Sequence, residues 1–192
     1  MIFKKKYIQY LIFILLYGCS FYSFKGSLPP GINSVYFSQV SNLTSEFELT
    51  NILNKKIIDR LITENVLEVV NFSSGDSQLD LIITSVKNQP NVSRYSSQDN
   101  YELVEQWELK VFFKIIWYDI NNNSIIFEIE AEEWAMYNNS GIDISKDGID
   151  NDGDTYIDSQ DSDEFGAPRE ASIKIIGNKI AERVLHELIS IW

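Results

Sequence analysis

The sequence is poor in the residues on which catalytic and metal sites commonly depend. Its 192 residues include one cysteine, Cys19, and one histidine, His186. A lone cysteine forms no disulfide within the chain, and the sequence has no zinc-ligand spacing, glycine-rich phosphate loop or nucleophile elbow. His186 falls beside the apolar stripe of a predicted helix without acid–base partners, which is typical of a surface or boundary residue. We therefore expect a protein that is not an enzyme and that binds no organic cofactor.

Basic residues are scarce as well. The chain has 16 lysines and arginines against 28 aspartates and glutamates, which gives a net charge of −12. Because so acidic a chain repels the phosphates of nucleic acid, we expect no nucleic acid among its partners. Aromatic residues make up 13% of the chain, and this share argues against disorder over most of its length.

The first 18 residues have the pattern of a signal peptide. Met1 to Lys6 carry three lysines, and the residues from Tyr7 to Tyr17 are almost entirely apolar. This apolar run is too short to span a bilayer as an anchor. We predict that residues 1–18 are removed on export, and the mature chain is then still more acidic because the three lysines are lost.

The end of this segment predicts the attachment point. Leu16-Tyr17-Gly18-Cys19 resembles the lipobox of bacterial lipoproteins, with an aliphatic residue three positions before the cysteine and a small residue just before it. The resemblance implies that Cys19 is acylated, and two or more hydrocarbon chains hold a protein at a membrane without a spanning helix. We predict a lipidated tether at residues 19–33 and one folded domain at residues 34–192, a length that suits a single hydrophobic core.

Two segments of this domain have the apolar spacing of amphipathic helices. In the first, apolar residues recur every three or four positions from Leu49 to Ile62, and Ser45–Glu48 matches a capping box at the expected start. The second runs from Ile173 to Trp192 with the same spacing over about five turns. Each helix has one wide apolar stripe to bury.

The remaining segments predict strands. Their ranges are Ser34–Val40, then Leu67–Phe72 and Leu79–Lys87 across a turn at Ser73–Asp76, then Tyr101–Ile120 and Ser124–Trp134. In the last of these, apolar residues alternate with glutamates, as in a half-buried antiparallel strand. If Asn121–Asn123 is the turn before it, three cross-strand pairs follow, and all their parities agree: Lys114 with Glu130, Ile115 with Ile129, and Trp117 with Phe127.

These elements predict an α+β fold. We expect a two-layer sandwich in which two helices pack side by side on one face of a mostly antiparallel four-stranded sheet. The opposite face, with the glutamates, is left for solvent or a partner. The tryptophans are expected in the core, because all of them fall in amphipathic elements: Trp107, Trp117, Trp134 and Trp192.

Two short motifs lie in the tether, at Gly18–Phe24 and at Leu28–Gly31, and a strand, a helix, three strands and a C-terminal helix follow. This order resembles the LptE family of lipopolysaccharide-assembly lipoproteins over nearly the whole mature chain except Ser140–Ala167. The resemblance implies a sandwich domain on the periplasmic side of the outer membrane, which plugs the barrel LptD, helps to assemble it, and assists lipopolysaccharide to the outer leaflet. It assigns no lipopolysaccharide-binding residue, because the family has no short motif that maps onto this chain.

An acidic insertion at residues 140–167 predicts a calcium site. It resembles the calcium loops of thrombospondin type 3 and dockerin repeats, because carboxylates recur at loop places one, three, five, nine and twelve, with a backbone carbonyl at place seven. These ligands are Asp150, Asp152, Asp154, Asp158 and Asp161, with Tyr156 supplying the carbonyl. Thr155 departs from the pattern, since it replaces the glycine expected at place six.

A second calcium frame overlaps the first from upstream and has the expected glycine, Gly148, at place six. Its side-chain ligands are Asp143, Ser145, Asp147, Asn151 and Asp154. Shared ligands such as Asp154 would let two ions bind side by side. The alternative is a solvated acidic loop that binds no ion, since the insertion has few apolar residues to anchor it.

Three hypotheses of function follow from the sequence. The first is a non-enzymatic LptE-type assembly and transport lipoprotein with a barrel partner. The second is a calcium-dependent surface-adhesion or binding lipoprotein. The third is a hydrolase, which would need convergent polar side chains; adjacent carboxylates such as Glu132 and Glu133 fall on opposite faces of a strand and do not converge.

Overall fold

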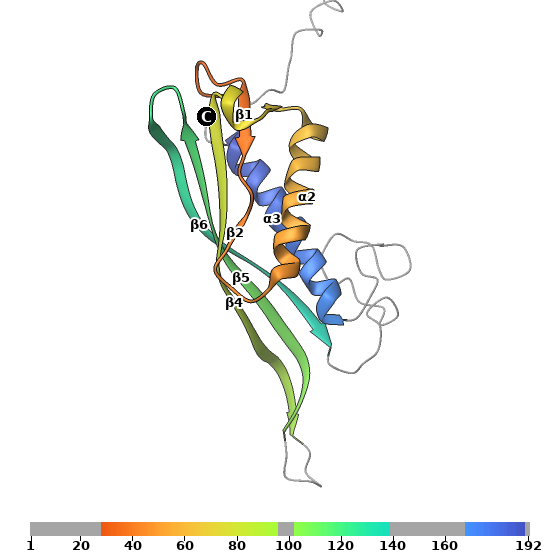
Figure 1. Cartoon of the computed structure of the whole chain (residues 1–192). Coiled ribbons are helices and arrows are strands. Elements are labelled where there is room, and N and C mark those ends of the chain that lie inside the picture. Colours follow the sequence, from red (N-terminus) through yellow and green to blue (C-terminus); the bar gives the residue numbers. More distant parts are fainter. Residues whose placement is uncertain (1–27, 96–101, 139–167, 191–192) are drawn as a thin grey trace, which may run out of the picture.

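The computed structural model describes residues 28–95, 102–138 and 168–190. The predicted signal peptide, Cys19, Trp192 and the acidic insertion lie outside these ranges. In the described part, two helices cover one face of a six-stranded sheet (Figure 1). The elements, in chain order, are β1 (Ser34–Phe37), β2 (Ser41–Asn42), α2 (Phe47–Glu64), β3 (Glu68–Val69), the 3₁₀ helix η2 (Phe72–Ser74), β4 (Ser77–Tyr95), β5 (Glu102–Asp119), β6 (Ser124–Asn138) and α3 (Pro168–Ser190).

The α+β class is confirmed, but the prediction of four mostly antiparallel strands is wrong. The sheet order is β3-β1-β4-β5-β6, and β2 pairs with β4 off this path. β1 runs parallel to both β3 and β4, whereas the β4–β5 and β5–β6 pairs are antiparallel. The physical reason is the crossover through α2, which returns the chain to the end of the sheet where it started and so makes β3 parallel to β1.

The predicted pairing of the third and fourth strand segments across Ser73–Asp76 is also wrong, because β1 lies between β3 and β4. Asp76 explains this arrangement. One of its carboxylate oxygens accepts hydrogen bonds from the backbone N–H of Asn33 and of Ser34, each at 3.1 Å, and from the Ser34 hydroxyl at 2.8 Å. The start of β4 is thereby fixed beside the start of β1.

The predicted β5–β6 hairpin is confirmed, with Lys114 opposite Glu130, Ile115 opposite Ile129 and Trp117 opposite Phe127. The turn lies at residues 120–123, where Asn123 has a φ of 51°. Asn tolerates this left-handed conformation better than most residues. The Asp119 carboxylate closes the turn by accepting hydrogen bonds from the Asn122 backbone and side-chain N–H groups at 2.9 and 2.8 Å.

The predicted helices both form, but the capping box does not. α2 begins at Phe47, and no side chain caps it directly. Asn42 instead holds the entry to the helix, because its side-chain amide donates to the Glu46 carbonyl and its oxygen accepts from the Thr44 backbone. The start of α3 at Pro168 is five residues before the predicted one, since proline is well accommodated in the first helical turn.

The two helices lie side by side and run in the same direction. Arg169 near the start of α3 pairs with Glu46 before α2, and Arg60 near the end of α2 pairs with Glu182 farther along α3. The helices touch closely at Gly177, where an added Cβ would lie 2.6 Å from Ile52 Cγ2. A side chain at position 177 would therefore force the helices apart.

The hydrophobic core fills the space between the helices and the sheet. The odd-numbered residues of β5 from Trp107 to Trp117 point into it, as their shared parity predicts, and Trp117 and Ile115 are fully buried. Its largest fully buried side chains also include Phe113, Leu49, Leu53, Ile57, Leu61, Leu79, Leu81, Ile83 and Leu109. Among the residues that the structure describes, no helix has the length and apolar character needed to cross a membrane.

Candidate functional site

The helices leave one face of the β4–β5–β6 sheet uncovered by any described element (Figure 1). We call this surface the open face. It consists of the even-numbered side chains of β5 from Glu108 to Tyr118 and their neighbours on β4 and β6, which alternate with the core residues because successive strand residues point to opposite faces. The sequence predicts such a face, with glutamates on it.

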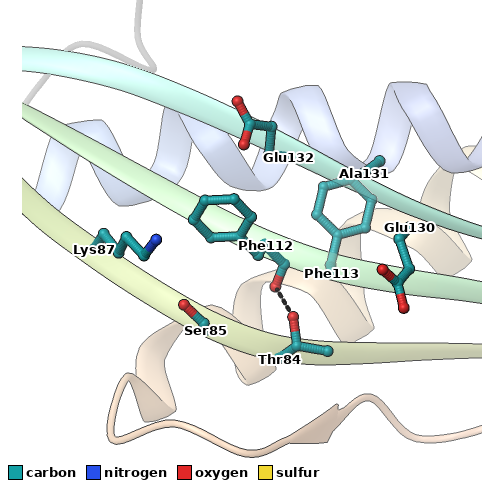
Figure 2. Close-up of a pocket in the computed structure, with 8 residues that line it drawn as sticks. All are labelled: Thr84, Ser85, Lys87, Phe112, Phe113, Glu130, Ala131 and Glu132. Atoms are coloured by element: carbon teal, nitrogen blue, oxygen red, sulfur yellow. Dashed lines mark hydrogen bonds between the residues drawn. The ribbon is translucent and has the colours of Figure 1, made fainter.

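A pocket of about 510 Å³ lies on this face, at a β-bulge in β4 (Figure 2). The bulge takes Thr84 out of the ladder between Ile83 and Ser85, and the Thr84 hydroxyl donates to the Phe112 carbonyl at 3.0 Å. The lining residues are Thr84, Ser85, Lys87, Phe112, Phe113, Glu130, Ala131 and Glu132.

The floor of the pocket combines an aromatic ring with charges of both signs. Lys87 Nζ lies 4.8 Å from the centroid of the Phe112 ring, which is the geometry of a cation–π contact (Figure 2). Glu132 comes from the neighbouring strand on the far side of this ring. The apolar ring of Phe112 is thus surrounded by polar groups, an arrangement that suits binding of an amphipathic partner.

Ion pairs cross from β5 to β6 over the rest of the open face. Lys110 Nζ lies 3.2 Å from Glu132 and 3.7 Å from Glu108, and Lys114 bonds to Glu128. The hydrogen bond that Lys110 donates to Glu132 raises the pKa of Lys110, and the hydrogen bond that Lys114 donates to Glu128 raises the pKa of Lys114. Both lysines thus stay charged, and the face presents charges of both signs.

The two adjacent glutamates of β6 point to opposite faces, as predicted. Glu132 joins the open face, whereas Glu133 lies on the helix side near Lys179 and Arg183 of α3. Burial raises the pKa of Glu133, and the two basic residues partly offset that effect. The pair therefore does not converge on one substrate.

The structure corrects the prediction for one tryptophan. Trp117 is in the core and Trp107 packs against it, but Trp134 is 40% exposed on β6. Lys179 covers part of it, with Nζ 5.2 Å from the ring centroid and 3.3 Å from the Trp134 carbonyl oxygen. The reason is its strand parity, because Trp134 lies opposite Lys110 and so falls on the open-face side of β6 together with Glu132. His186 is exposed, as predicted.

The most specific predicted site residues lie outside the described ranges. These are the lipid-attachment residue Cys19 and both calcium frames, within 143–161. Across residues 28–95, 102–138 and 168–190, no group of three or more His, Cys, Asp or Glu side chains has an arrangement that would hold a metal ion. Sequence reasoning missed the Phe112 pocket, although an aromatic residue of the non-core parity was a visible signal.

No protein-family model matches the sequence, and no curated protein matches it either. Several solved structures are similar in fold. Protein CT253 from Chlamydia trachomatis aligns with a TM-score of 0.51 and 12% identity over 83% of this chain and 99% of its own. Protein XCC0632 from Xanthomonas campestris, of family DUF330, aligns with a TM-score of 0.51 and 7% identity over 86% of this chain and 88% of its own.

Rare lipoprotein B from Shewanella oneidensis aligns with a TM-score of 0.45 and 19% identity, over 81% of this chain and 94% of its own. At these identities, the first two similarities show the α+β fold and nothing about activity, and the third score is too low to support a conclusion.

Proposed function

We propose that this chain is a non-enzymatic envelope lipoprotein of the LptE type, held by Cys19 at the periplasmic side of the outer membrane. Its role is to plug an LptD-type β-barrel and to help assemble it for lipopolysaccharide transport. The Gly18-Cys19 motif after an apolar leader supports the anchor, because lipid attachment holds a domain to a bilayer without a spanning helix.

The open face is the observation that supports the proposal of a barrel partner. A plug inside a large outer-membrane barrel meets a polar wall, because the residues that face the lumen are polar. The open face fits this requirement with its ion pairs between β5 and β6, Lys110 with Glu132 and Lys114 with Glu128, beside the aromatic ring of Phe112. A uniformly apolar face would instead favour a lipid or an apolar partner.

A photocrosslinking experiment tests this proposal. A photoreactive residue replaces Lys87, on the open face, and in a control chain it replaces Ile62, which is 60% exposed on α2. Each full-length chain is irradiated in the producing cells and purified in mild detergent. We expect a covalent adduct with a large β-barrel from position 87, weaker or absent from position 62. Adducts of equal yield, or no barrel adduct, would contradict the open face as the barrel contact.

A calcium-dependent adhesion or binding lipoprotein is the second candidate. Only the carboxylate spacing between Asp143 and Asp161 favours it. It predicts a ligand whose binding is lost on calcium removal, whereas the barrel adduct is expected to form equally with and without a chelator.

A further inference from the structure

β6 forms one outer edge of the sheet, and in the described part of the chain it pairs with β5 alone (Figure 1). Every second residue of an edge strand directs its backbone N–H and C=O groups away from the sheet, where they are available to another strand. The bond from Lys179 to the Trp134 carbonyl oxygen closes the edge at that point. The open part of the edge is therefore residues 124–133, which we call the β6 edge.

The core-facing side chains of the β6 edge are incompletely covered. Phe127, Ile129 and Ala131 are each only partly buried, whereas Ala135 and Tyr137, farther along the same strand, are buried. The difference arises because α3 packs on the second half of β6, where Lys179 reaches Trp134, while no described strand covers the first half from the side. One further strand with apolar side chains on the helix side would complete this row.

The open-face side of the same edge carries three carboxylates in a row. Glu128, Glu130 and Glu132 occupy every second position and so lie roughly 6.8 Å apart, which is twice the rise of a strand residue. Lys114 and Lys110 pair with the outer two from β5, and Glu130 has no ion pair with any described residue. An adjacent strand with a basic residue at every second position would match this spacing.

These features point to one class of occupant. We propose that the β6 edge binds an extended segment of another protein in which basic and apolar residues alternate, by adding it to the sheet as a further strand. Its basic side chains lie beside Glu128, Glu130 and Glu132, and its apolar side chains cover Phe127, Ile129 and Ala131. This surface differs from the open face in that the contact is made mainly by backbone hydrogen bonds.

Two other occupants fit less well. A second copy of this chain would bring two rows of glutamates together, and like charges on adjacent strands are destabilising. The chain's own segment 139–167 is strongly acidic and has one basic residue, Lys146, so it does not match the charge of the edge either.

The test uses the full-length chain in detergent micelles and a ten-residue peptide of alternating lysine and valine as the probe. A second peptide of the same sequence carries N-methyl groups on alternate backbone amides, which blocks strand pairing without changing charge. Binding is measured by fluorescence anisotropy, and hydrogen exchange locates the peptide. We expect protection of the amides of residues 124–133 by the first peptide and at least a roughly fivefold weaker affinity for the second.

Charge-matched variants separate the edge from general attraction to an acidic protein. Glu130→Lys alters the β6 edge, and Glu64→Lys makes the same change of charge at the end of α2. We expect the first to weaken peptide binding roughly fivefold and the second to change it little. Equal effects of the two variants, equal binding of the N-methylated peptide, no binding, or protection elsewhere would overturn the proposal. A dimer protected at residues 124–133 without peptide would replace it with self-association.

Discussion

The indole of Trp117 lies edge-on against the ring of Phe127, with the ring centroids 5.7 Å apart and the planes at 66°. The two residues are directly opposite each other in the β5–β6 ladder. Trp117 is fully buried, yet its Nε1 has no hydrogen-bond partner in the described structure. Its contribution to stability therefore comes from packing, and the unpaired N–H reduces that contribution.

Trp117→Ala is expected to lower the free energy of unfolding by about 3–5 kcal/mol, because it leaves a large cavity in the core. Trp117→Phe should cost clearly less, since it keeps most of the contact and removes a buried unpaired donor. Trp134→Ala is the control and should cost less than about 1 kcal/mol, given its exposed position. Urea denaturation measures all three. If Trp134→Ala were as damaging as Trp117→Ala, the burial pattern would be wrong.

The strand parity predicts a graded series of substitutions. Ile115→Asp should prevent stable folding, because it buries a carboxylate at a position with no exposure. Ile129→Asp, directly opposite, should destabilise less, because this residue is partly exposed at the β6 edge. Glu130→Ala should change the melting temperature little. Thermal unfolding followed by circular dichroism gives the order, and an Ile115→Asp variant that folds and melts at the same temperature as Ile129→Asp would contradict the edge position of β6.

The β5–β6 hairpin was predictable because the residues that determine its register lie close together in the sequence. Three cross-strand pairs had to agree in parity around one turn, and a register slip of one residue would have placed glutamates in the core. The place of β4 beside β1 was not predictable, because it depends on Asp76 accepting hydrogen bonds from backbone groups 42 and 43 residues away. No local pattern encodes such a contact.

The candidate site was predictable to a similar degree. Alternating glutamates on β6 indicated a polar sheet face, and the register placed Lys114 opposite Glu130. The ion pair forms diagonally instead, from Lys114 to Glu128, because a long side chain reaches the next position on the same face. The pocket beside Phe112 depends on the bulge at Thr84, and a single sequence does not reveal where a strand bulges.

Acidification should weaken the fold through Asp76. The hydrogen bonds from the backbone of Asn33 and from the hydroxyl of Ser34 lower the pKa of this carboxyl below its ordinary value of 3.8. A carboxyl with a lowered folded-state pKa stabilises the protein above its unfolded-state pKa, and that stabilisation is lost as pH falls through the folded-state value. The loss is therefore expected below about pH 4.

The variant Asp76→Asn tests this dependence. It should be less stable than the wild type at neutral pH, because a neutral amide oxygen accepts the hydrogen bonds of residues 33 and 34 less strongly than a carboxylate oxygen does. Its stability should also fall less on acidification, since the titrating group is gone. Asp59→Asn, on the exposed side of α2, serves as the control with the same charge change. Parallel curves of unfolding free energy against pH for the wild type and Asp76→Asn would exclude this role.

The lipid anchor is tested at Cys19. We expect Cys19→Ser to accumulate as an unprocessed precursor, because the thiol is the lipid acceptor and its modification precedes cleavage. Intact-mass spectrometry distinguishes the two forms. A wild-type mature chain that begins at Cys19 with no acyl mass would rule out the lipoprotein assignment.

The acidic insertion is expected to bind calcium weakly. Its carboxylates repel one another when no ion is bound, so binding must gather six or more oxygens from the segment. The affinity should be on the order of 10⁻⁴ to 10⁻³ M, as in extracellular modules, because Thr155 replaces the glycine of one frame. Calorimetry with millimolar calcium measures it. Replacement of Asp152 and Asp154 together by alanine should abolish the heat.

Deletion of residues 140–167 tests whether the domain folds without the insertion and whether the calcium response is then lost. The segment joins β6 to α3, and a shorter connection there costs modest loop entropy, so the sandwich should still fold with its circular dichroism spectrum largely retained. Calcium should then neither release heat nor raise the melting temperature. A calcium response that survives the deletion would place the site elsewhere in the chain. A wild type that does not respond to calcium would favour the solvated acidic loop, because without a bound ion no interaction offsets the entropy cost of ordering the segment.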